Sequence, residues 1–489
     1  MNLNKLHCTL FNSRLPPTTS PLYNSFAPSS STSILNSISL SEMEDGRSRV
    51  NVHSILTSVS SRPFGAVKTF PLTQLGHAMG RHTIHLIFYY EKSPLGSFDV
   101  DPMRESLSEV LSLYPLATGR LTRDGAGNWE VKCNDAGVRV LRARVGVTLD
   151  EWLRSANGSE ERDLTVWEDM PESPSTWSPF RVQINDFEGG GLAIGVSCTH
   201  MHADSTSLAL LLKAWSEANR RQPIAYLPSF HPPTPQPPST NIETKSTNYL
   251  AAKSQAHTPP VKMATATFKF SDSIIKQCIS RIHDKCPHAN PFDLLAALFS
   301  TRILHLKGSK NDRTHSLSVC VDFRRLLQEP LPYGYFGNAL YFSLLSINAE
   351  EIECGDLGRM AELVHCHVSG LKEEEFWSAL HWLESQKEGG KYAPPFTMYG
   401  PELTCVSMEH MIVGDQSVMY SAIFDSARPV HVSCHVGNVE GEGLILVMPS
   451  AEGRARTVTV TLPEEEIAKL SKDQAILCLE PEVLFCGKV

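Results

Sequence analysis

The sequence predicts an α/β protein built from two halves of similar size, residues 43–225 and 263–489. Segments with the composition of strands alternate with segments of helical spacing in both halves. Between them, residues 226–262 hold five prolines from Pro232 to Pro238 and then a polar stretch without a hydrophobic period. Such a composition is typical of an extended, exposed linker.

In the first half, residues 81–90 are rich in β-branched and aromatic side chains, which favours a buried strand. Residues 101–115 carry apolar side chains at helical spacing and end at a proline, so we expect a helix there. Residues 127–135 and 137–145 are each strand-like and lie close together in the chain, which predicts a hairpin.

The second half continues the alternation. A helix should begin after Ser271, because serine is a good N-cap, and another should begin near Pro291. Pro463 should start a further helix, with three glutamates at its positive end. The expected strands of this half are 264–270, 316–324, 339–347 and the alternating segment before Pro463.

The composition excludes several classes of protein. The 489 residues carry a net charge of -9 and show no basic stripe, which argues against nucleic-acid binding. The 12 cysteines are scattered without a CxxC pair, which indicates reduced thiols rather than disulfides or a zinc ribbon. No apolar run approaches the roughly 18 residues of a membrane span, so none is expected.

Residues 1–42 differ from the rest of the chain. They are rich in serine and threonine, contain no acid before Glu42, and have Lys5 and Arg14 as their only strong bases. This profile is that of a transit peptide or disordered prefix, and a cleaved transit peptide would place the protein in plastids. If translation instead starts at Met43, a cytoplasmic location is expected.

The segment CTHMHADSTSL, residues 198–208, contains the most informative polar residues. A strand is expected up to His200, and a helix should follow with Asp204 or Ser205 as its N-cap. His200 therefore stands where a rigid element ends, a common place for catalytic groups. Period two puts it on the same face as a row of apolar side chains, which are Leu192, Ile194, Val196 and Cys198.

Three interpretations of this segment compete. In the first, His200, His202 and Asp204 resemble the HxHxDH signature of metal-dependent hydrolases, although Ser205 replaces its last histidine. His431 and His435 could add ligands, but no matching aspartate stands near them. In the second, the histidine and the aspartate only stabilise the turn. In the third, His200 is a general base and Asp204 fixes the turn, while Cys198 is a small core residue.

The third interpretation gains support from a resemblance. The HMHAD segment matches the HxxxD motif of the plant BAHD acyltransferases, and residues 318–343 resemble the V-D-x-R…P-x-P-x-G-Y-F-G-N block of that family. The long linker and the closing segment also fit, so that the resemblance covers about residues 50–485.

The resemblance implies two chloramphenicol-acetyltransferase-like domains joined by the linker, with a central solvent channel and His200 near its middle. Donor and acceptor would enter from opposite faces. Acyl-CoA would be a co-substrate, with no bound cofactor and no metal. The motif's aspartate, here Asp204, would point away from the substrate and pair with an arginine, to which Arg324 corresponds. A monomer is expected.

The sequence departs from the family pattern at two places. Ser205 stands where a glycine usually follows the aspartate, and the DFGWG motif falls on residues 423–427, where only Phe424 matches. Because this loop shapes the domain interface near the coenzyme in the family, Phe424 should support the site, while donor binding or acceptor type should be unusual.

The expected reaction belongs to plant specialised, phenylpropanoid metabolism. Neutral His200 would take a proton from a hydroxyl or amine as it attacks the thioester of a hydroxycinnamoyl-type CoA, a contribution of roughly 10²–10⁴-fold. The acceptor would be a separate small molecule or the donor's own ortho-hydroxyl, which would close a coumarin lactone. The alternative from another class is a non-catalytic accessory protein of a lipid elongation complex.

Overall fold

The computed structural model describes residues 48–63, 65, 67–92, 102–232, 244–308 and 314–485. The prediction of a transit peptide or disordered prefix at residues 1–42 lies outside them. So do four of the five prolines from Pro232 to Pro238, because residues 233–243 are not described.

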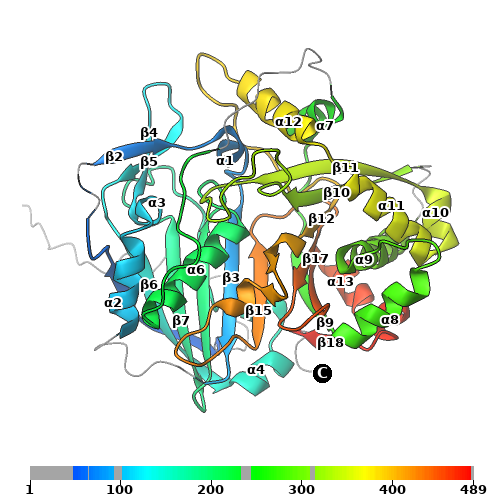
Figure 1. Ribbon diagram of the computed structural model, residues 1–489, viewed down its shortest axis with the longest axis horizontal. Helices are drawn as coiled ribbons and strands as arrows, with labels where there is room; N and C mark the ends of the chain where they lie inside the picture. Colours follow the sequence, from blue (N-terminus) through cyan, green and yellow to red (C-terminus); the bar gives the residue numbers. More distant parts are fainter. Residues whose placement is uncertain are drawn as a thin grey trace, which may run out of the picture. The chain divides into compact units, whose positions relative to one another are not determined.

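A six-stranded mixed sheet carries the segment that contains His200. Its strand order is β1-β6-β7-β8-β3-β15, and Figure 1 shows β15 beside β3 although the two are more than 300 residues apart in the chain. The first sheet thus takes its last strand from the second half of the sequence. The six strands are β1 (Val50–Ser58), β6 (Val138–Thr148), β7 (Phe180–Glu188), β8 (Leu192–Thr199), β3 (Thr83–Tyr90) and β15 (His431–Val436).

A seven-stranded sheet, in the order β11-β10-β12-β16-β17-β9-β18, is formed by the second half alone. Two small sheets, β2-β5-β4 and β13-β14, complete the strands. The seven strands are β11 (Leu340–Asn348), β10 (Thr314–Asp322), β12 (Leu403–Ser407), β16 (Leu444–Pro449), β17 (Arg456–Pro463), β9 (Met263–Phe270) and β18 (Glu482–Leu484). The small sheets contain β2 (Lys68–Pro71), β5 (Trp129–Cys133), β4 (Arg120–Arg123), β13 (Ile412–Val413) and β14 (Gln416–Ser417).

The helices pack against these sheets, with α2 against α6 beside the first sheet and α9 against α11 beside the second (Figure 1). The helices of the first half are α1 (Gln74–Ala78), α2 (Pro102–Leu111), α3 (Pro115–Thr118), α4 (Leu149–Ser155), α5 (Gly158–Arg162) and α6 (Ser205–Asn219). Those that follow are α7 (Lys245–Gln255), α8 (Asp272–Ile282), α9 (Pro291–Lys307), α10 (Ala349–Cys354), α11 (Leu357–Ser369), α12 (Glu373–Ser385), α13 (Glu464–Leu470), α14 (Gln474–Leu477) and the 3₁₀ turns η2 (Glu409–Met411) and η3 (Met419–Ser421). Within the described ranges, none of them has the length and apolar character needed to cross a membrane.

Most sequence-based expectations for single elements are confirmed. Strand β3, helix α8 after its N-cap Ser271 and helix α9 with proline in its first turn all lie where they were expected. The helix expected over 101–115 ends earlier, at Leu111, and the short helix α3 starts separately at Pro115.

The predicted hairpin is wrong. Strand β5 pairs with β2 and β4, whereas β6 pairs with β1 and β7 in the large sheet. Asp135 (φ +49°) and Gly137 (φ +81°) between them carry the chain from one sheet to the other. Glycine is needed here because a Cβ on Gly137 would lie 2.5 Å from the backbone oxygen of Ser58. A hairpin and this sheet-to-sheet turn give the same sequence signal.

The polar part of the linker is also not extended throughout, because α7 forms within it. A capping box at Thr244 starts this helix, and the buried Lys253 in its last turn pairs with Glu402 of the second half. The sequence did not show it because the helix buries few apolar residues and depends on this tertiary contact.

Strand β8 is buried on both faces, as its run of apolar and small residues suggests. Leu192, Ile194, Val196 and Cys198 face the main core, while Ala193 belongs to a smaller cluster on the other face, which confirms the expected alternation. The strand ends at Thr199, so His200 is the first residue after it.

Candidate functional site

His200 lies in the turn between β8 and α6, and its backbone is held on both sides. Its N–H donates to the carbonyl of His82 on one side, at 2.9 Å. Its own carbonyl accepts a hydrogen bond from the Asn338 amide, at 2.7 Å. The imidazole therefore projects from a fixed backbone.

The His200 side chain is completely buried, with 0% of its surface exposed. Its Nε2 lies 2.9 Å from the hydroxyl of Tyr399, and the two rings stack with centroids 5.8 Å apart. Burial lowers the pKa of His200 to about 4, a change that the nearby charge of Asp204 only partly offsets. The imidazole is therefore neutral at physiological pH, which is the form that a general base requires.

Asp204 is the N-cap of α6, and both of its carboxylate oxygens are occupied. It accepts from the backbone N–H of Ser207 at 2.9 Å, from Ala339 at 3.1 Å, and from the Arg324 guanidinium at 2.8 and 2.9 Å. Burial alone would raise the pKa of Asp204, but the charge and hydrogen bonds of Arg324 outweigh it and lower the pKa. Asp204 is thus an ionised anchor of the turn rather than a group available to a substrate.

Arg324 joins the HMHAD segment to the block at residues 318–343. It is fully buried, pairs with both Asp204 and Asp322, and donates to the backbone carbonyls of Tyr335 (3.0 Å) and Gly337 (3.2 Å). The segment that provides Asn338 is thereby fixed against the turn that carries His200.

Sequence reasoning missed two neighbours of His200, Asn338 and Tyr399. Asn338 ends the G-Y-F-G-N part of the block at residues 318–343, so its place in that motif was an available signal. Tyr399 lies 199 residues after His200, and nothing in its local sequence marks it.

The family comparison agrees with this geometry. The model of the Transferase family matches residues 50–477. The chain belongs to this family. Its members are the BAHD acyltransferases, so the protein is an acyltransferase with acyl-CoA as its co-substrate.

Two relatives illustrate the range of the family. Hydroxycinnamoyltransferase 1 of Oryza sativa subsp. japonica is 27% identical over 413 residues, which cover 79% of this chain and 90% of the relative. Protein ECERIFERUM 2 of Arabidopsis thaliana is 24% identical over 431 residues, covering 84% and 94%.

Solved structures confirm the predicted fold class of two chloramphenicol-acetyltransferase-like domains. Vinorine synthase superposes with a TM-score of 0.67 at 20% identity, covering 88% of this chain and 98% of its own. TRI101 of F. graminearum, complexed with ethyl coenzyme A, gives 0.66 at 14% identity, covering 85% and 99%.

The three side chains of the HxHxD pattern do not converge. The His202 Nδ1 is 2.7 Å from the Thr199 hydroxyl and its ring meets the edge of Phe180, while Arg324 occupies Asp204. His435 binds the buried Glu161 instead, at 3.0 Å. Across the part of the chain that the structure describes, no three His, Cys, Asp or Glu side chains are grouped to hold a metal ion.

Cys198 is a core residue of this BAHD protein. Its side chain is 2% exposed, and burial raises the pKa of the thiol well above its usual value. The thiol therefore stays protonated, and no thiolate nucleophile is formed here.

Phe424 keeps a structural role although the rest of its motif is lost. It is fully buried, with its ring edge-to-face against Trp215 (5.2 Å) and Tyr90 (5.9 Å) of the first half. The next residue, Asp425, replaces the first glycine of DFGWG and adopts φ +52°, which aspartate tolerates better than most residues. Asp425 and Ser426 are exposed, so the loop places an acid where the motif has its glycine.

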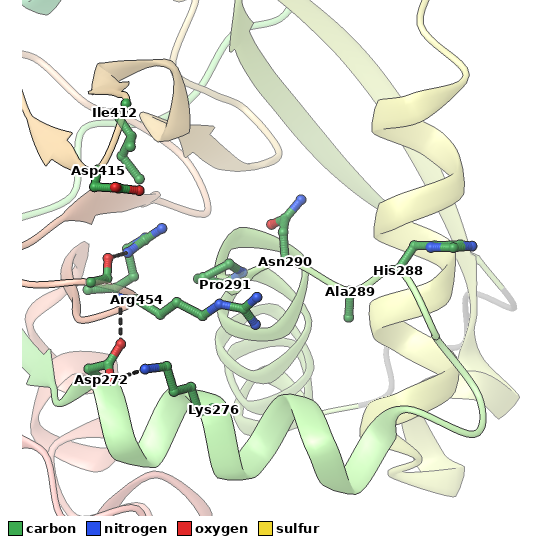
Figure 2. A pocket seen from close by; sticks show the side chains of 12 residues that line it. Asp272, Lys276, His288, Ala289, Asn290, Pro291, Ile412, Asp415 and Arg454 are labelled. Atoms are coloured by element: carbon green, nitrogen blue, oxygen red, sulfur yellow. Dashed lines mark hydrogen bonds and ion pairs between the residues drawn. The ribbon is translucent and has the colours of Figure 1, made fainter.

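The described structure contains two cavities of similar size, of which one reaches the His200 turn. One, of about 570 Å³, has the backbone neighbour of His200, Met201, in its wall, together with His77, Arg123, Trp129, Lys391 and Tyr392. The other, of about 550 Å³, lies between α8, the start of α9 and the turn before β17 (Figure 2). Neither is lined by His200, whose Nε2 is covered by Tyr399.

Proposed function

We propose that the protein transfers a hydroxycinnamoyl-type acyl group from coenzyme A to a hydroxyl or amine, with His200 as the general base. The observation that carries this proposal is the neutral imidazole of His200 at the HxxxD turn, which the buried Asp204–Arg324 pair fixes. The hydroxycinnamoyl donor is inferred from the relatives' names, and the plastid location from residues 1–42.

For this reaction the protein has to position the two substrates and supply a base. The acceptor O–H or N–H gives its proton to Nε2 of His200 while its oxygen or nitrogen attacks the thioester carbonyl. The tetrahedral intermediate then expels the coenzyme A thiolate, and the imidazolium returns the proton to that sulfur. No acyl-enzyme is required, because the thioester is already activated.

The cavity at α8 and α9 is lined by three basic side chains, Lys276, Arg454 and Arg456, and two acidic ones, Asp272 and Asp415, and this net positive charge supports binding of the anionic nucleotide end of coenzyme A there. Figure 2 shows Arg454 and Lys276 among its lining side chains, next to Asp272. Lys276 pairs with Asp272 at 2.6 Å, whereas the structure shows no ion pair for the guanidinium of the exposed Arg454 within its described ranges. The first turn of the 17-residue α9 adds the positive end of a helix dipole.

Replacing Arg454 by alanine should raise the KM for an acyl-CoA about 5- to 10-fold with little change in kcat, because the interaction is made in ground state and transition state alike. The same thioester of pantetheine, which lacks the nucleotide, should show no such difference between the two proteins. The matched control is Arg281→Ala, because Arg281 is an exposed arginine of α8 that does not line the cavity. Equal KM values for wild type and Arg454→Ala would refute this docking site.

The acceptor is proposed to be either a small alcohol or amine or the donor's own ortho-hydroxyl. Loss of four of the five DFGWG residues, with Asp425 and Ser426 exposed in their place, supports an unusual member. Intramolecular attack on an ortho-hydroxylated cinnamoyl thioester would release coenzyme A and a coumarin lactone.

Thiol release from a panel of acyl-CoA donors, with and without acceptors, tests the proposal. We expect wild type to exceed His200→Ala by roughly 10²–10⁴-fold with the correct substrates. Release without acceptor and with a lactone product would indicate intramolecular transfer, whereas release only with alcohols or amines would indicate transfer to a second molecule. Equal release by wild type and His200→Ala would refute the base assignment.

A second candidate is an accessory role in lipid elongation. The ECERIFERUM relatives and the complete burial of His200 support it. It predicts that the His200→Ala protein restores the wild-type phenotype to a plant that lacks the native protein. Failure of His200→Ala to do so, at equal protein level, would favour catalysis.

A further inference from the structure

The Tyr399 hydroxyl lies where a general base would hold the group that it deprotonates. Its oxygen is 2.9 Å from Nε2 of His200, both rings are buried, and no second hydrogen bond of this hydroxyl is found in the described parts of the chain. A hydroxyl at hydrogen-bond distance from a neutral imidazole is the geometry that general-base catalysis requires of the acceptor.

The hydrogen-bond inventory indicates which way this bond runs. If the Tyr399 O–H donates to Nε2, the His200 proton is on Nδ1, and only Nδ1 lacks a partner among the described residues. In the reverse arrangement, the buried Tyr399 O–H and the bare Nδ1 would both be unsatisfied. The first arrangement therefore has the lower free energy, because each unpaired buried polar group is unfavourable. It leaves the lone pair on Nε2, as a base acting there requires.

The backbone around Tyr399 is fixed, but its hydroxyl is held by a single bond. The Met398 N–H donates to Nε2 of His82 at 3.1 Å, and the Tyr399 carbonyl accepts from Glu440 at 3.3 Å. The ring contacts His82 and Phe342 edge-on, at 5.0 and 5.3 Å. A rotation of the side chain would free Nε2 at the cost of this hydrogen bond and of the ring contacts with His200, His82 and Phe342.

We propose that the Tyr399 hydroxyl takes the place of the acceptor hydroxyl in the unoccupied enzyme. Tyr399 is then a positioning residue, which holds His200 in the tautomer of a base and keeps water from its lone pair until an acceptor replaces the hydroxyl. This inference rests on the proposed role of His200 as the base.

The first test is Tyr399→Phe, which keeps the ring and removes the hydroxyl. Hydrolysis of the acyl-CoA without acceptor should rise at least about 10-fold, because water can occupy the vacated position. The KM for the acceptor should fall by roughly 2- to 10-fold, the range of one ordinary hydrogen bond. Tyr90→Phe, which removes a buried hydroxyl bonded to the carbonyl of Ala422, should change neither value. A decrease or no change in hydrolysis with Tyr399→Phe, or an acyl group attached to Tyr399 by mass spectrometry, would overturn the proposal.

The second test does not depend on turnover. Nitrogen-15 NMR of histidine-labelled protein, with the His200 signals assigned by His200→Ala, should show the proton on Nδ1 in wild type and a mixture of tautomers in Tyr399→Phe. A proton on Nε2 in wild type would overturn the inference whatever the kinetics show. If the observed tautomers match these expectations but His200→Ala has normal turnover, the proposed function fails and this inference does not.

Discussion

Replacing Arg324 by alanine should lower the free energy of unfolding by about 3–5 kcal/mol and reduce acyl transfer at least about 100-fold. The guanidinium is 0% exposed and is the counter-ion of two buried carboxylates, Asp204 and Asp322. Its removal leaves these charges unpaired in the interior, which is the costly way to break a buried ion pair. Activity should fall because the His200 turn and the Asn338 segment then lose their common anchor.

Urea unfolding followed by fluorescence, together with thiol release, measures both effects. Arg325→Ala is the matched control, because Arg325 is adjacent and exposed, and its guanidinium lies over the Tyr333 ring at 4.7 Å. This control should lose less than about 1 kcal/mol. If Arg324→Ala were no less stable than Arg325→Ala, the buried pair would not be the anchor of this turn.

The folded protein should lose stability below about pH 6.5, with a slope that reaches about 5 kcal/mol per pH unit near pH 5. Burial lowers the pKa of several histidines, among them His82 and His202 to about 3 and His200 and His431 to about 4. The unfolded chain takes up a proton on each near pH 6.5. Between about pH 6 and 4.5, unfolding therefore binds three to four protons on these histidines, and each contributes roughly 1.4 kcal/mol per pH unit.

Urea unfolding at pH 7.5, 6.5, 6.0 and 5.5 tests this expectation. These four histidines should lower the free energy of unfolding by about 1.4 kcal/mol between pH 7.5 and 6.5 and by about 4 kcal/mol between pH 6.5 and 5.5. His202→Gln should reduce the slope by about one proton, or 1.4 kcal/mol per pH unit. An unfolding free energy that does not change between pH 6.5 and 5.5 would contradict the buried, neutral state of these histidines.

Local sequence determined most of the single elements and the chemical centre of the protein. Alternation along residues 192–200 and the capping residue Asp204 are local properties, because side-chain direction in a strand and N-cap preference depend on neighbours in the chain. They predicted strand β8, helix α6 and the position of His200 between them. The HxxxD resemblance added the family and the assignment of Arg324 as the partner of Asp204.

Only the tertiary structure decided what surrounds that centre. Sequence pattern could not show that β5 and β6 join different sheets, or that β15 completes the first sheet, because strand pairing over long separations leaves no local signal. Nor could it show that the Tyr399 hydroxyl meets Nε2 of His200, or that burial keeps this imidazole neutral. Both depend on side chains that approach from distant parts of the chain, and burial and hydrogen bonding set protonation only after those parts have packed together.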